Sequence, residues 1–221
     1  MKYLIILICL SVTFITKAQD VKSTSNEQEN QKLELNAISF MGGLTFSSFI
    51  FDDTQIAINN QYDYKVDASL GLNFEFETNR HLLRPELLYR RVGSSSEINE
   101  TQLSWTLSYL DLNLGYLYRV LDNEKFKIAT GLSVGTGFMM QGTQYIGQVM
   151  YDTNDDRFLD RFDLTSSFLL NFNFKLSKTV DLFAEYRFGI SILNLEKDND
   201  QSTRNMFHIL GMGLSFHIGE L

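Results

Sequence analysis

The stretch from Met206 to Ile218 alternates strictly between two kinds of position. Its even-numbered residues are almost all apolar, whereas the odd-numbered ones include the small residues Gly211, Gly213 and Ser215. Successive side chains of a strand point to opposite faces, so the pattern predicts a strand between an apolar and a more polar environment. At about 10 residues or more, such a strand is long enough to cross a hydrocarbon layer when tilted.

Similar alternating segments recur from residue 37 onward, and the links between them are alternately short and long. Outer-membrane barrels have short periplasmic turns and longer external loops. We therefore predict an all-β fold, a transmembrane, antiparallel, up-and-down β-barrel of eight strands with both chain ends in the periplasm. The expected strands are 37–49, 65–77, 82–94, 103–120, 126–141, 162–175, 180–193 and 206–218. The short links are 78–81, 121–125 and 176–179, and the long links are 50–64, 95–102, 142–161 and 194–205.

The less apolar face of these segments carries charges of both signs. Buried charges must be paired or neutralised, and an interior of about eight strands is only just filled by side chains. We expect a salt-bridged network that plugs a polar interior; the alternative is that the same charges line a narrow permeation path. The network is expected to comprise Glu75, Arg84, Glu86, Arg90, Asp111, Arg119, Lys127, Asp181, Glu185 and Arg187.

Two places fit the alternation less well. In the fourth segment Leu107 and Tyr109 are out of phase with Leu110, which predicts either a bulge near Ser108 or a hairpin that extends above the membrane. The single proline, Pro85, is expected near the periplasmic rim, where the loss of one ladder hydrogen bond is tolerated.

The N-terminus reads as an export signal. Lys2 precedes an apolar run, and residues 16–18 form a plausible exit, so we expect a signal peptide over 1–18, a disordered periplasmic leader over 19–36 and the barrel over 37–221. The single cysteine, Cys9, lies in the signal, so the mature chain needs no disulfide. With a formal net charge of −8 the chain is a poor binder of nucleic acid.

The link 142–161 contains oxygen-bearing side chains at the alternate spacing of a calcium loop, namely Asp152, Asn154 and Asp156, with Asp160 further on. Arg157, however, occupies the position of the usual turn glycine. A solvated acidic loop is the better interpretation, and we expect no cofactor.

A lipid-modifying enzyme would need a nucleophile, a base and an acid close to one leaflet. His208 and Ser48 share the lipid face near the outer rim, on strands that barrel closure would make neighbours, but that face offers no acid to orient the histidine. We therefore expect a protein that is not an enzyme. A soluble lipocalin-like barrel is the alternative fold, and it would expose rows of apolar side chains to water.

Several short motifs, in their order and spacing, resemble the PorT-like outer-membrane β-barrel family of Bacteroidetes-type bacteria. They are residues 84–89 (RPELLY), 109–111 (YLD), Gly131 and 186–189 (YRFG). The resemblance implies a small outer-membrane barrel of the size of OmpA or OmpX barrels, without catalytic residues. The final strand, with Gly213, Phe216 and Ile218, also resembles the signal read by the barrel-assembly machinery.

The expected function is that of a surface or scaffold barrel that presents external loops or supports an envelope or secretion partner. Lipids of the outer membrane and lipopolysaccharide are its expected surroundings. A narrow pore and a lipid-modifying enzyme are the alternative functions.

Overall fold

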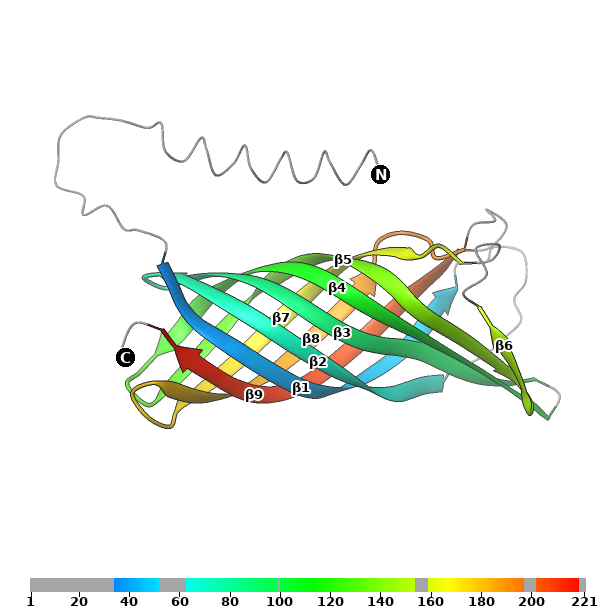
Figure 1. The fold of residues 1–221 in the computed structure, drawn as a ribbon, viewed down its shortest axis with the longest axis horizontal. Helices are drawn as coiled ribbons and strands as arrows, with labels where there is room; N and C mark the ends of the chain where they lie inside the picture. The colour runs from blue at the N-terminus through cyan, green and yellow to red at the C-terminus, as the bar shows by residue number, and fades with distance from the viewer. Residues whose placement is uncertain (1–33, 52–62, 99, 154–158, 197–201, 219–221) are drawn as a thin grey trace, which may run out of the picture. The chain divides into compact units, whose positions relative to one another are not determined.

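The computed structural model describes residues 34–51, 63–98, 100–153, 159–196 and 202–218. These residues form nine antiparallel strands, and β4 pairs with β5 so that the sheet closes into a ring (Figure 1). The strands are β1 (Glu34–Phe51), β2 (Asp63–Thr78), β3 (His81–Ile98), β4 (Thr101–Asp122), β5 (Phe126–Ile146), β6 (Val149–Asp152), β7 (Phe162–Lys175), β8 (Val180–Ser191) and β9 (Thr203–His217).

Eight of these strands make the barrel, and β6 is a short addition to the end of β5. The ring closes between the first and last strands, which stay in register from Ala37 opposite His217 to Phe51 opposite Thr203. The predicted eight-stranded up-and-down barrel is therefore confirmed. No helix in the described part of the chain is long and apolar enough to span a membrane.

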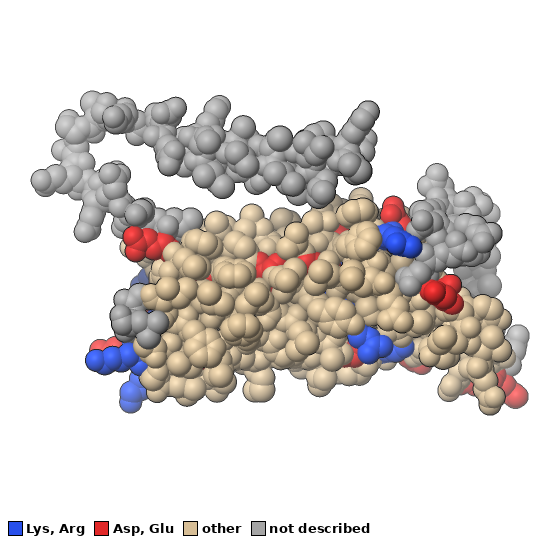
Figure 2. Space-filling view, viewed as in Figure 1, with Lys and Arg blue, Asp and Glu red and all other residues tan. Residues whose placement is uncertain are grey.

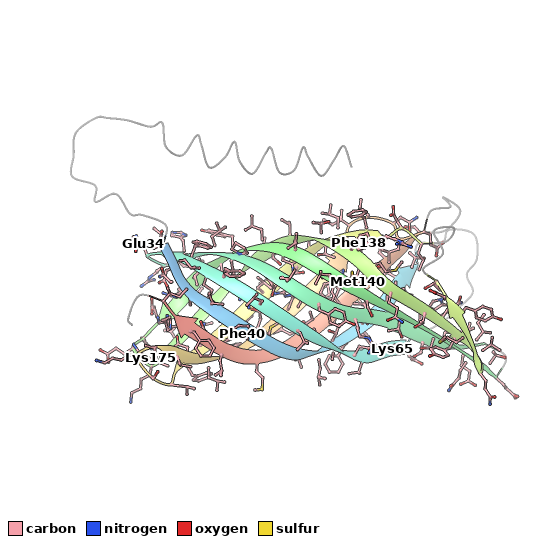
Figure 3. All side chains as sticks on the ribbon, viewed as in Figure 1. Glu34, Phe40, Lys65, Phe138, Met140 and Lys175 are labelled. Carbon is pink, nitrogen blue, oxygen red and sulfur yellow. The ribbon has the colours of Figure 1, made fainter. Side chains whose placement is uncertain are left out.

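The two alternating sets of positions in the sequence face the inside and the outside of the ring. In β9, Leu210, Met212 and Leu214 are exposed on the outside, and Phe207 and Ile209 are buried inside. Figure 3 shows outward side chains all along the ring, including Phe40, Phe138 and Met140. An isolated ring with this apolar outer surface requires a hydrocarbon environment.

Two interior glycines allow neighbouring strands to approach each other closely. A Cβ atom on Gly131 would lie 2.0 Å from the carbonyl oxygen of Tyr116, and one on Gly213 would lie 1.8 Å from that of Phe40. Any larger residue would push the strands apart, so glycine sets the tight curvature of the ring at these points.

Several strands extend further than the sequence predicted, whereas β7 has the predicted bounds and β8 ends at Ser191, two residues early. β1 begins at Glu34, three residues before the expected start. The expected long link 95–102 is wrong, because β3 and β4 remain paired as far as Ile98 opposite Thr101. Within the link 142–161, β5 continues to Ile146, turns at Gly147 with a positive φ of 59°, and returns as β6. Cross-strand pairing thus overrides the polar, loop-like composition of these segments.

Both explanations for the irregular fourth segment apply. The β4–β5 register shifts between Ser108 and Tyr109, where Met140 of β5 is the additional residue, and the β3–β4 hairpin continues beyond this point. Tyr109 and Leu107 are simply buried inside the barrel. At Pro85, four residues from the start of β3, the paired positions of β2 and β3 are interrupted, in agreement with the lost ladder bond.

Candidate functional site in the barrel interior

Four charged side chains from opposite walls meet in the middle of the barrel. The Arg187 guanidinium on β8 donates two hydrogen bonds of 2.7 Å to Glu86 on β3 and one of 3.0 Å to Glu185. Arg84 lies 2.6 Å from Glu185. The amides of Asn113 and Asn171 donate to Glu86 at 2.8 Å and to Glu185 at 3.3 Å. We call Arg84, Glu86, Glu185 and Arg187 the four-charge cluster; it is buried, and its formal charges cancel.

A second group, the Arg90 cluster, consists of Arg90, Asp111 and Asp163. The Nε atom of Arg90 lies 2.5 Å from Asp111, and its Nη2 atom lies 2.7 Å from Asp163. The guanidinium carbon lies over two rings, 4.7 Å from the centroid of Tyr109 and 4.6 Å from that of Phe207. Cation–π contact stabilises a desolvated guanidinium.

Two neutral groups also bind Asp163. Ser191 donates to it at 3.0 Å and Asn205 at 3.3 Å. The Arg90 cluster therefore has one cation against two carboxylates, and hydroxyl and amide donors supply part of the remaining stabilisation.

Apolar side chains occupy much of the remaining interior. One cluster packs around the Arg90 cluster, and a second lies toward the short-turn end. The first comprises Met41, Phe49, Leu88, Val92, Leu107, Tyr109, Met139, Phe183, Phe207 and Ile209, and the second comprises Leu82, Leu117, Ala129 and Leu169. The expectation of a polar interior is thus wrong in part: the charges are embedded in apolar packing.

The remaining predicted network residues lie near the short-turn end. Arg119 binds Glu77 with two hydrogen bonds, the longer being 2.6 Å, and Glu75 accepts from Ser39 at 3.1 Å. Asp181 lies 3.0 Å from the Nε2 atom of His217. Lys127 is half-buried and joins neither cluster, and we find no ion pair for it among the described residues. Of the predicted network residues, Lys127 is therefore the one for whose side chain the described residues provide no hydrogen-bonding or ionic partner.

The sequence prediction missed Asp163, Tyr109 and Phe207. All three have the inward phase of their strands, so the alternation contained a signal for them. What the alternation does not contain is which inward residues meet across the barrel.

Two of the four residues of the suggested calcium loop lie outside the described residues. Asn154 and Asp156 belong to the stretch 154–158, Asp152 ends the exposed strand β6, and Asp160 accepts the N–H of Phe162 at 3.2 Å. Among the described residues there is no group of three or more side chains suited to hold a metal ion.

On the outer surface, His208 is part of an aromatic cluster rather than a triad. Its Nδ1 atom lies 2.8 Å from the Tyr186 hydroxyl, and the rings of Tyr64, Tyr186 and Phe188 surround it at centroid distances of 5.0 to 6.1 Å. Ser48 is only 6% exposed. The partner of the histidine is therefore a phenol where a triad needs a carboxylate.

A matching pair lies at the opposite end of the outer surface. The Nδ1 atom of His81 lies 2.6 Å from the hydroxyl of Tyr116, and the two rings stack 5.9 Å apart. Both barrel rims thus carry a histidine that is hydrogen-bonded to a tyrosine, as expected for amphipathic side chains at membrane interfaces.

Comparison with known families identifies the chain. Residues 18–197 match the family model of the outer membrane protein β-barrel domain. The chain belongs to this family. The match begins before the first strand and ends before β9, and it places the protein in the outer membrane.

Solved outer-membrane barrels resemble this family member in architecture. Neisserial surface protein A is 11% identical, with 82% of this chain and 99% of that chain covered and a TM-score of 0.49. Ail of Yersinia pestis is 14% identical, with coverages of 83% and 100% and a TM-score of 0.39. The N-terminal barrel of Pseudomonas aeruginosa OprF is 8% identical, with coverages of 83% and 98% and a TM-score of 0.39. No curated protein matches the sequence.

Proposed function

We propose that this outer-membrane barrel is a non-enzymatic, closed anchor that presents an extracellular β-sheet to a protein partner of the cell envelope. The proposal rests on one observation: one side of the barrel extends further than the other at the end opposite the short turns. β3, β4, β5 and β6 continue as a paired sheet, whereas β7 pairs with β5 only as far as Phe138 opposite Phe162 (Figure 1). Such a one-sided projection gives a partner a preformed surface.

The projecting sheet has apolar side chains that face solvent. Tyr145, Ile146, Val149, Met150 and Tyr151 are 38–59% exposed. They lie beyond the level at which the other strands end, so contact with hydrocarbon does not account for them. Exposed apolar groups gathered on a sheet end are typical of a protein contact site.

The packing of the interior supports an anchor in preference to a pore. A conducting path needs a continuous column of water, whereas both charge clusters are buried beside apolar side chains. An enzyme is disfavoured because the Nδ1 atom of His208 faces Tyr186 and no acid. The PorT-like motifs favour a partner in a secretion or envelope machine, reached after export through the Sec pathway.

Site-specific photo-crosslinking in whole cells tests the proposal. A photoreactive residue at Met150 should give a discrete protein adduct, and one at the lipid-facing Leu112 should not. Equal labelling at the two positions, or no adduct at Met150 and Tyr151, would overturn the presentation role. Discrete, steady conductance of the refolded chain in planar bilayers would overturn the closed interior.

A further inference from the structure

The outer surface of the barrel carries a polar, ionisable side chain close to the border of its apolar belt. In a bilayer, every hydrogen-bonding group requires a partner, and ionisable residues on a membrane-spanning element are functional candidates by default. His208 is such a residue. Tyr186 satisfies Nδ1, but no hydrogen bond to Nε2 is found among the described residues.

The depth of His208 can be derived from the strand register. Phe216, which pairs with Ile38 and Val180, marks the short-turn end, and His208 lies eight residues away along β9. At about 3.3 Å per residue and a tilt near 40°, this is about 20 Å along the membrane normal. The apolar band of such barrels is about 25 Å tall, so His208 lies about 5 Å inside its external border, within reach of the lipid head groups.

The aromatic cluster around His208 is wide. Tyr64 is on β2, whereas Tyr186 and Phe188 are on β8, so the cluster spans the joint between the first and last strands. By contrast, His81, Tyr116 and Tyr118 at the other rim occupy only the neighbouring strands β3 and β4. A broad platform with hydrogen-bonding groups suits a large lipid head group that has several polar substituents.

A cation lies beside this platform. Arg91 has the outward phase of β3, three residues before Ser94, the partner of Tyr64. Its side chain is 43% exposed and lies 3.5 Å from Asp67. Lys65, labelled in Figure 3, follows Tyr64, but its ammonium group donates to Ser104 and Thr106 on β4, so it is not offered as a ligand. Figure 2 shows basic side chains at the border of the mostly uncharged belt. A guanidinium at this depth is suited to a lipid phosphate, which it binds through paired N–H groups.

We infer that His208, Tyr186, Tyr64 and Arg91 form a binding site for a phosphorylated glycolipid of the outer leaflet, that is, the lipid anchor of lipopolysaccharide. Nε2 of His208 binds a hydroxyl or carbonyl group of the acylated sugar, the tyrosine rings cover its apolar edge, and Arg91 binds its phosphate. This site goes beyond the presentation role and does not depend on the projecting sheet.

The test uses the mature chain refolded into phosphatidylethanolamine and phosphatidylglycerol bilayers, with and without purified lipopolysaccharide. Native mass spectrometry after mild extraction counts the lipopolysaccharide molecules retained per barrel. His208→Phe and Arg91→Gln should each weaken retention about tenfold, the loss of one charge-assisted or buried hydrogen bond. Tyr186→Phe, which removes one hydroxyl, should give a smaller loss.

The opposite rim provides the matched control. His81→Phe and Tyr116→Phe remove the same chemistry in the periplasmic leaflet and should leave retention unchanged. The inference is overturned if the control variants lose as much lipopolysaccharide as His208→Phe, if His208→Phe and Arg91→Gln retain it fully, or if phosphatidylglycerol competes with it equally well. Crosslinking at Met150 in the His208→Phe variant separates this result from a failure of the presentation role.

Discussion

The two charge clusters inside the barrel differ in their balance. In the four-charge cluster two guanidinium groups face two carboxylates, and Glu185 contacts both arginines. In the Arg90 cluster a single guanidinium serves two carboxylates. The first arrangement has redundancy and the second has none, so the two should respond very differently to the loss of one arginine.

The largest effect is expected for Arg90→Met. It leaves Asp111 and Asp163 buried without a cation, and breaking a buried pair costs about 3–5 kcal/mol. Urea unfolding in lipid vesicles, followed by the heat-modifiable gel shift, should show a loss of stability at or above the top of this range. A loss below about 1 kcal/mol would show that the two carboxylates do not need the cation, although Ser191 and Asn205 donate to Asp163 and not to Asp111.

Arg84→Met should cost less, about 1–3 kcal/mol, because Glu185 keeps Arg187 and Asn171 as donors. The same unfolding assay makes the comparison direct. If Arg84→Met lowers the free energy of unfolding as much as Arg90→Met does, then Arg187 and Asn171 do not compensate for the loss of Arg84.

A double variant sharpens the contrast. Arg84→Met with Glu185→Leu removes one charge of each sign and leaves Arg187 with Glu86, so it should recover part or all of the stability lost in Arg84→Met. Arg90→Met with Asp111→Leu still leaves Asp163 unpaired and should recover less. Equal recovery in the two double variants would contradict the difference in balance.

The smallest effect is expected at the rim. Arg119→Gln breaks the contact with Glu77. Arg119 is buried, but the Glu77 side chain is 20% exposed at the short-turn end, so water can solvate the carboxylate that is left behind, and we expect a loss of about 1 kcal/mol. The loss should shrink further in high salt, and stability measured at two ionic strengths checks this. A salt-independent loss of several kcal/mol would show that water does not compensate the Glu77 carboxylate when Arg119 is replaced.

The side of the barrel on which each residue lies could be predicted from the sequence. Alternation alone predicted that Arg84, Glu86 and Arg187 face inward, and all three are buried inside the barrel. Contacts across the interior could not be predicted, because Glu86 and Arg187 meet across the ring although they lie 101 positions apart. Their meeting depends on shear and diameter, which are collective properties of all the strands.

The residues at which the strands begin and end could not be predicted from the sequence either. Residues 95–98 contain serine and glutamate and look like a loop, yet they continue β3 because β4 pairs with them along their length. Similarly, the cation–π contact of Arg90 requires Phe207 on the face of β9 that also holds the small residues Gly211, Gly213 and Ser215. Local composition indicates the average environment of a strand. Whether one position can hold a large side chain depends on the free space across the barrel interior, which local composition does not contain.

The pairing of β1 with β9 also has a consequence for the order of assembly. Every other joint in the ring links strands that follow one another closely in the chain, but this one joins Ala37 to His217 and Phe51 to Thr203. A contact of such sequence separation carries the greatest loop-closure entropy and forms slowly. Until β9 is available for pairing, β1 keeps an open hydrogen-bonding edge, so the unfolded chain needs protection from aggregation until this fifteen-residue strand has joined the ring.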